Sequence, residues 1–262
     1  MDEAAAQAGS RAKTAPRPQS LLRRDGSRTR LELLSGFGLN HDGEPIELPL
    51  ASQRVVAFLA LQQRPVQRVF VAGNLFMDSP EDRANARLRT ALWRMRRRCC
   101  PIVSATSTHL ALAAGTSVDV RESRNRARHI VAGSCDLSSS DVQALSASGE
   151  LLPDWYDDWV LLERERFRQL RMHALEALCR ELAASGRYAQ ATEAGLAAVE
   201  VEPLRESAHR ALIHAYLLEG NPCEAIRQYR LYRDMLRREL GLEPSRRMRR
   251  MVVALRGCVT AQ

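Results

Sequence analysis

Lysine is nearly absent from this chain of 262 residues, because all of its 39 basic side chains except Lys13 are arginines. Lys13 follows Ala12 in a segment with no strand before it, so the chain lacks the Gly-Lys-Ser/Thr sequence of a phosphate-binding P-loop. The shortage of lysine excludes classical nucleotide hydrolysis and the kinase and Schiff-base mechanisms that need a buried lysine. Because an arginine excess of this kind is typical of a GC-rich genome, the places where arginines cluster carry more information than their number.

Paired cysteines and long apolar runs are missing too. The six cysteines contain no C-x-x-C pair, so neither a zinc site nor a disulfide framework is predicted, and Cys179 and Cys223 are predicted to be small buried side chains. No run approaches the roughly 18 apolar residues of a membrane helix, and the N-terminal segment lacks an apolar signal-peptide region. We therefore expect a cytoplasmic protein without membrane contact.

Polar residues offer no convincing catalytic or metal site. Asp154, Asp157 and Asp158 stand close together, but Trp155 and Trp159, four residues apart, instead predict an aromatic contact that opens a long helix. No nucleophile, base and orienting group stand at recognisable spacing, so we expect no enzyme activity, no cofactor and no metal. The histidines of the helical half also lack ligand partners at metal-binding spacing; these are His173, His209 and His214.

The segment from Arg83 to Arg98 contains seven arginines and no acidic residue. Its apolar residues follow the spacing of a helix with one buried stripe, formed by Leu88, Ala91, Leu92 and Met95. Ser79 is predicted to cap this helix and Pro80 to occupy its first position.

The outward face of this helix is predicted to contact DNA. Arginine pairs with phosphate and with the O6/N7 edge of guanine, whereas a helix that is merely soluble usually interleaves glutamate. A solvated basic face is the alternative. The predicted base readers are Arg87, Thr90, Arg94 and Arg97, and the further predicted contacts on this helix are Arg83, Arg89, Trp93 and Arg96.

Short elements precede the arginine helix. Alternating residues from Arg30 predict strands, and Asp42-Gly43 predicts a hairpin turn. A helix capped by Ser52 is predicted to follow and to end before Pro65, with Val55, Val56, Leu59 and Ala60 as its buried face. An extended piece at 69–71 and a brief helix at 72–76 lead to the arginine helix.

A β-hairpin is predicted beyond Pro101. Strands, helix, short helix, basic helix and hairpin, in this order, resemble the winged-helix domain of OmpR/PhoB-type response regulators. The resemblance implies that the third helix enters the major groove. It also implies that Thr106, Ser107 and Thr108 form the wing, at phosphates or the minor groove, with His109 beside it.

The second half repeats with a period of 34 residues, because the Gly186–Ala191 segment recurs in outline as Gly220–Ala225. This is the period of tetratricopeptide repeats, which are antiparallel helix pairs. The last helix of the second pair is predicted to end at Gly241 and Pro244, and a further helix is predicted over 245–255. The predicted packing positions are Leu175, Leu178, Leu182, Ala191, Ala198, Pro203, Leu212, Tyr216, Ala225 and Tyr229.

Three further segments have weaker signals. Residues 1–28 read as a disordered basic tail. The segment 120–130, which holds Arg121, Arg124, Arg126 and Arg128, is predicted to be a second basic helix that either reaches DNA or a partner or is solvated. The serine-rich stretch 134–148 is predicted to be a loop.

Four motifs of the second half together resemble the bacterial transcriptional activator domain, which defines the SARP-type antibiotic regulatory proteins when it follows a winged helix. The motifs are Leu151–Val160 (LLPDWYDDWV), Glu163–Arg166 (ERER), Glu202–Glu206 (EPLRE) and Glu239–Pro244 (ELGLEP). The resemblance implies an activator of a biosynthetic gene cluster that binds direct repeats near a promoter as side-by-side protomers and recruits RNA polymerase through its sigma or alpha subunit. Longer members of the family carry an additional ATPase domain, and this sequence stops before such a domain. Regulation by nucleotide is therefore not expected within this polypeptide.

The predicted fold is thus an α+β winged helix followed by an all-α helical-repeat region. Charge supports the division, since residues 1–120 hold 17 basic and 11 acidic side chains and the remainder holds 22 and 20. The predicted parts are a basic tail (1–28), the DNA-binding winged helix (29–117) and the activator domain (118–262). The alternative function is an interaction adaptor of tetratricopeptide type whose winged helix no longer binds DNA.

Overall fold

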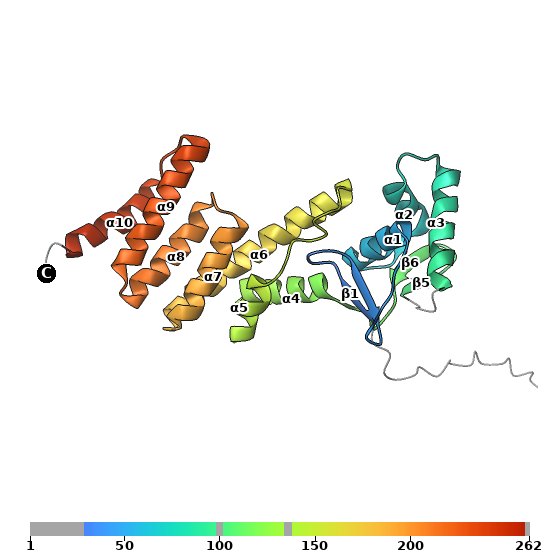
Figure 1. The fold of residues 1–262 in the computed structure, drawn as a ribbon, viewed down its shortest axis with the longest axis horizontal. Helices are drawn as coiled ribbons and strands as arrows, with labels where there is room; N and C mark the ends of the chain where they lie inside the picture. Colours follow the sequence, from blue (N-terminus) through green and yellow to red (C-terminus); the bar gives the residue numbers. More distant parts are fainter. Residues whose placement is uncertain (1–28, 98–101, 134–137, 260–262) are drawn as a thin grey trace, which may run out of the picture.

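The computed structural model describes residues 29–97, 102–133 and 138–259, so the predicted tail over 1–28 lies outside the described residues. The described part is elongated, with the sheets and α3 toward one end and α10 at the other (Figure 1). Its order of elements confirms an α+β winged helix followed by an all-α array, while the predicted domain boundaries stay predictions. Among the helices that the structure describes, none is both long and apolar enough to span a bilayer.

Short strands form two small sheets. One sheet has the order β3-β2-β1-β7, in which β7 runs parallel to β1, and the other is the antiparallel sheet β4-β6-β5. The predicted turn at Asp42-Gly43 joins β2 to β3, and both residues have positive φ, as a two-residue hairpin turn requires. The strands are β1 (Thr29–Glu32), β2 (Gly38–His41), β3 (Glu44–Pro45), β4 (Val66–Gln67), β5 (Val103–Ala105), β6 (His109–Leu112) and β7 (Ser117–Val118).

Helices α1 (Leu50–Leu61), α2 (Arg68–Leu75) and α3 (Glu81–Arg96) complete the winged helix. The predicted buried face of α1 is confirmed. Its start is different, because Pro49 is the N-cap and Ser52 lies inside the helix, where its buried hydroxyl donates to the Ala91 carbonyl at 3.2 Å.

The predicted extended piece at 69–71 is wrong, because α2 already begins at Arg68. Val71 and Leu75 lie one helical turn apart and are both buried, so packing overrides the preference of valine for strands.

The helical half begins at α4, and the long helices α6 to α9 pack against one another in succession (Figure 1). The serine-rich stretch, predicted to be a loop, contains helix α5. Ser138 and Asp141 form a capping box at its start, and its side chains Val142 and Leu145 are buried. The helices are α4 (Asp119–Val131), α5 (Ser139–Ser146), α6 (Asp158–Ala184), α7 (Tyr188–Val201), α8 (Glu206–Glu219), α9 (Pro222–Leu240) and α10 (Arg246–Val259).

The predicted repeat packing is confirmed in α6 to α9, where the leucines and alanines are buried and the two tyrosines are partly buried. The remaining predicted position, Pro203 between α7 and α8, is exposed. Gly241 ends α9 with a φ of 66°, as predicted. Cys179 is buried as predicted, but Cys223 is exposed because it lies in the first turn of α9, away from the core.

The start of the helical half packs into the core of the winged helix. Leu151 forms an isolated antiparallel bridge with Leu34, and the Leu152 amide donates to the Leu33 carbonyl at 2.9 Å. Leu151, Leu152 and Phe167 belong to the same buried cluster as β1, α1 and α3. The chain entering α6 therefore adds to the first core instead of forming a separate linker.

Aromatic rings close this junction. Trp155 and Trp159 contact each other edge to face with ring centroids 6.3 Å apart, as predicted. Trp155 also stacks on Phe37 with a centroid distance of 6.1 Å, and Trp159 meets Phe58 of α1 at 5.3 Å. Asp157 between them forms an ion pair with Arg54 of α1.

The second basic segment also serves this junction. Arg121 donates to the carbonyls of Leu59, Ala60 and Gln62 at 3.1, 2.6 and 2.6 Å, so it caps the C-terminal end of α1. Arg124 is buried and pairs with Glu163 of α6 at 2.8 Å. Both arginines therefore bind groups of α1 and α6 within the chain, although Arg121 is only partly buried.

Candidate nucleic-acid interface

Helix α3 packs against the rest of the winged helix through the predicted apolar stripe. Leu88, Ala91 and Met95 are 1%, 2% and 3% exposed, and Leu92 and Ala84 also lie in the core. Contrary to the prediction, Pro80 and not Ser79 is the N-cap, and no side chain accepts a hydrogen bond there. The buried stripe fixes which side of α3 faces outward.

Every residue predicted to contact DNA from α3 is exposed. None of the six described arginines of this face is within ion-pair distance of an acid in the part of the chain that the structure describes. The seventh, Arg98, lies outside the described residues. The exposed residues are Arg83, Arg87, Arg89, Thr90, Trp93, Arg94, Arg96 and Arg97.

Two of these arginines are held by aromatic rings. The Arg87 guanidinium carbon lies 4.5 Å from the centroid of the Phe76 ring, and Nη1 of Arg87 donates to Ser79 Oγ at 3.1 Å. The Arg97 guanidinium carbon lies 4.9 Å from the centroid of Trp93, which is 56% exposed. Such cation–π contacts orient a guanidinium without neutralising it, so both groups keep their charge for an anion.

The wing is a short, rigid turn. Thr106, Ser107 and Thr108 are exposed between β5 and β6, as predicted. The Thr106 hydroxyl oxygen accepts from the His109 amide at 2.9 Å, so a side chain organises a turn that contains no glycine. Arg68, at the start of α2, donates to the Thr106 carbonyl at 3.1 Å and ties the wing to the helices.

Sequence reasoning missed the groups that support this face. Arg68 is the first residue of α2, and Phe76 and Ser79 lie in the connection between α2 and α3. Each of the three contacts a residue at least eight positions away. Such contacts leave no periodic signal in the sequence. The structure places α3 and the wing on the same domain, but whether their residues contact DNA stays a prediction.

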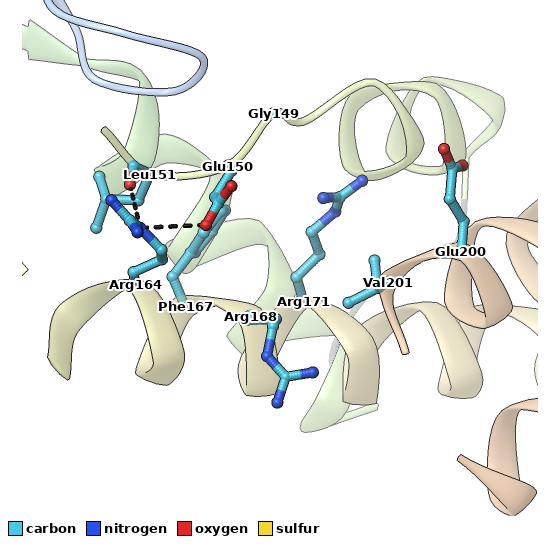
Figure 2. A pocket seen from close by; sticks show the side chains of 9 residues that line it. All are labelled: Gly149, Glu150, Leu151, Arg164, Phe167, Arg168, Arg171, Glu200 and Val201. Carbon is cyan, nitrogen blue, oxygen red and sulfur yellow. Dashed lines mark hydrogen bonds and ion pairs between the residues drawn. The ribbon is translucent and has the colours of Figure 1, made fainter. Parts of the chain in front are cut away.

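The arginines that line a cavity beside α6 are engaged differently. This cavity of about 480 Å³ is lined by the segment before α6, by α6 and by the end of α7, and Figure 2 shows its side chains. Arg164 donates to the Leu151 carbonyl at 2.9 Å and pairs with Glu150, while Arg168 pairs with two glutamates. Arg171 donates to the Leu145 carbonyl at 2.8 Å, and its burial lowers its pKa. These arginines are therefore paired with carbonyl and carboxylate groups of the fold. The described arginines on the outward face of α3, in contrast, have no acidic partner among the described residues.

The candidate metal ligands of the described ranges do not form a cluster. No group of three or more histidine, cysteine or acidic side chains within these ranges is arranged to hold a metal ion. His209 is fully buried, with Nε2 2.8 Å from the Pro203 carbonyl and Nδ1 2.9 Å from Gln228 Nε2. It is thus a satisfied core histidine.

Comparison with known proteins finds a family match in the second half of the chain. Residues 140–256 match the family model of the bacterial transcriptional activator domain. Among solved structures, the fold is similar to that of Mycobacterium tuberculosis EmbR, determined in complex with a low-affinity phosphopeptide, with a TM-score of 0.66 and 22% identity. The similarity covers 87% of this chain but only 64% of the EmbR chain, so this chain spans less than two thirds of that protein. No curated protein matches the sequence.

Proposed function

We propose that this chain activates transcription by binding promoter DNA through α3 and the wing. Residues 140–256 match the bacterial transcriptional activator domain and follow a winged helix, and this order of domains is the architecture of SARP-type regulators. The carrying observation is the exposed face of α3, on which six arginines have no acidic partner among the described residues. Elsewhere the chain commonly pairs its arginines, as it does at Arg124 and Arg168. An unneutralised row of this kind matches the charge of a DNA backbone.

The proposal divides the labour within this surface. Arg87, Thr90, Arg94 and Arg97 enter or border the major groove, where arginine recognises guanine. Arg83, Arg89, Arg96 and the wing residues hold phosphates, which fix the register without specifying bases. Trp155 and Trp159 pack against Phe37 and Phe58, so aromatic contacts join the helical array to the domain that carries α3.

The targets follow from the same architecture. We propose that the protein binds direct repeats near the promoter of a biosynthetic gene cluster, that protomers associate side by side on these repeats, and that the helical array recruits RNA polymerase through its sigma or alpha subunit. The activator domain over 140–256 supports this assignment.

Footprinting tests the DNA-binding step. Purified protein is incubated with the region upstream of its neighbouring operon, with random competitor DNA and a salt series. We expect protection of repeated sites at helical-turn spacing. The affinity should fall with salt at a log-log slope of about 0.9 per neutralised phosphate.

Matched variants sharpen this test. Arg94→Ala should reduce specific affinity by about 1–3 kcal/mol and relax one operator position, whereas Arg180→Ala, an exposed arginine of α6, should leave both unchanged. Equal losses on operator and random DNA would assign Arg94 to phosphate contact. Absence of protection at low salt, with a folded protein, would favour the adaptor function instead.

A further inference from the structure

A second acid-free arginine cluster lies on the last helix. The chain has no acidic residue after Glu243, and α10 begins with Arg246, Arg247, Arg249 and Arg250. All four side chains are exposed, while Met248 between them is fully buried. Five consecutive residues of α10 therefore present four positive charges around one buried side chain.

Neighbouring acids do not neutralise this cluster. Glu243 pairs with Arg237, and Glu206 accepts hydrogen bonds from the backbone amide and the hydroxyl of Ser245. The ion pairs formed by the described residues include none to the four arginines of α10. The preceding helix α9 differs, since Arg233 and Arg238 each pair with the acid that follows. The open charge is thus a local property of α10.

The start of α10 is held rigidly. The Ser245 hydroxyl oxygen accepts from the Met248 amide at 3.2 Å and thereby caps the helix, while Glu206 ties Ser245 to the start of α8. Met248 and Val252, one turn apart, pack inward. The four guanidinium groups are therefore carried on a fixed scaffold, which reduces the entropy lost when a partner binds.

The position of α10 determines which anion it fits. Figure 1 places α10 and α3 at opposite ends of the elongated molecule. Duplex DNA is stiff, with a persistence length of about 150 base pairs, so a duplex held by α3 does not return to the far end without strong bending. An acidic protein surface meets no such restriction, and charge complementarity of this kind speeds association and selects partners.

We propose that the arginines at positions 246, 247, 249 and 250 of α10 form the docking surface for an acidic protein partner, which is RNA polymerase if the proposed function holds. Only the identity of the partner rests on the proposed function. The geometry assigns recruitment to the end of the helical array and DNA reading to the other end of the chain, so the two contacts do not compete.

The test uses the full chain with two charge reversals, Arg246→Glu and Arg250→Glu. The matched control carries Arg128→Glu and Arg180→Glu, which make the same change in net charge at two exposed arginines of α4 and α6. The probe is the purified cognate RNA polymerase holoenzyme, and association is followed without DNA over a salt series. We expect the α10 variant to associate about tenfold more slowly than wild type and to lose most of its salt dependence, and the control to behave as wild type.

The outcomes separate the two proposals. Equal loss in both variants would reduce the effect to net charge and overturn the α10 surface, and so would unchanged binding of the α10 variant. If wild-type protein protects its operator but does not bind polymerase, DNA reading stands and the docking proposal fails. A fall of operator affinity and of its salt slope in the α10 variant would make α10 a second DNA contact, which also overturns it. Circular dichroism verifies that both variants fold.

Discussion

The ring of Phe76 lies under the guanidinium group of Arg87, with 4.5 Å between the guanidinium carbon and the ring centroid. Phe76 itself is 2% exposed and fixed in the core, so the ring is an immobile support. Ser79 Oγ accepts a hydrogen bond from the same guanidinium. Arg87 is therefore held in place before any DNA arrives, which lowers the entropy that it loses on binding.

Phe76→Leu should weaken specific DNA binding through Arg87. The leucine retains much of the volume but removes the cation–π contact, so we expect specific affinity to fall by about 0.5–1 kcal/mol. A double-mutant cycle checks the cause: in an Arg87→Ala background, Phe76→Leu should have little further effect on affinity. Additive losses would mean that Phe76 acts through packing alone.

Trp159→Ala should destabilise the whole chain. The ring fills the junction between α1 and α6, so its removal leaves a cavity, and we expect a loss of about 3 kcal/mol in the free energy of unfolding in urea. Tyr156→Ala, three residues earlier and 79% exposed, is the matched control and should change stability by less than about 0.5 kcal/mol.

A second substitution at this position separates the packing of the ring from the cost of burying its unpaired N–H group. Trp159 Nε1 is buried and has no hydrogen-bond partner in the described part of the chain. Trp159→Phe removes this donor but keeps an aromatic ring against Phe58, so it should cost clearly less than Trp159→Ala. Equal losses in the two variants would contradict a packing role for the ring at the junction.

Residue spacing in the sequence predicted the buried faces of helices but not their N-caps. The stripe from Leu88 to Met95 was correct because helical spacing alone sets which side of α3 is buried. The capping roles assigned to Ser52 and Ser79 were wrong, since proline at 49 and 80 stands at the N-cap and both serines serve tertiary contacts instead. Several neighbouring residues can occupy an N-cap position, and the packing of the surrounding helices determines which of them does so.

The junction and the supports of the candidate site were beyond sequence reasoning. Arg121 looks like part of a basic helix, yet it caps α1, some 60 residues earlier in the chain. Asp157 looks like part of an acidic cluster, yet it pairs with Arg54. In both cases the partner is fixed by chain topology, and one sequence without aligned relatives carries no trace of it.

The buried His209 should make stability depend on pH. Burial lowers its pKa below the usual value of 6.5, and the side chains that face it are Gln228 and Tyr232. Below about pH 6.5 the unfolded chain therefore binds a proton at His209 that the folded chain does not bind. The free energy of unfolding is highest above that pH and falls as the solution is acidified. The loss should reach at most about 1.4 kcal/mol per pH unit for this one proton. Urea unfolding between pH 7.5 and 5.5 measures it, and His209→Gln should flatten the profile over this window even if it lowers stability throughout. An unchanged slope in this variant would assign the pH dependence to other groups.

Gly195→Ala should destabilise the protein although alanine is the better helix former. A Cβ atom at this position of α7 would lie 2.9 Å from Leu212 Cδ1 and 3.0 Å from Cys179 Sγ, closer than packed atoms allow. The gain in helix propensity is about 1 kcal/mol, whereas overpacking a core costs about 1–3 kcal/mol, so we expect a net loss in the free energy of unfolding. Gly73→Ala is the matched control, because Gly73 also lies inside a helix but has no atom within 4 Å of its added Cβ, and this variant should gain about 0.5–1 kcal/mol. Stabilisation by both variants would mean that α7 and α8 can separate slightly without cost, and would contradict the close approach of the two repeats at Gly195.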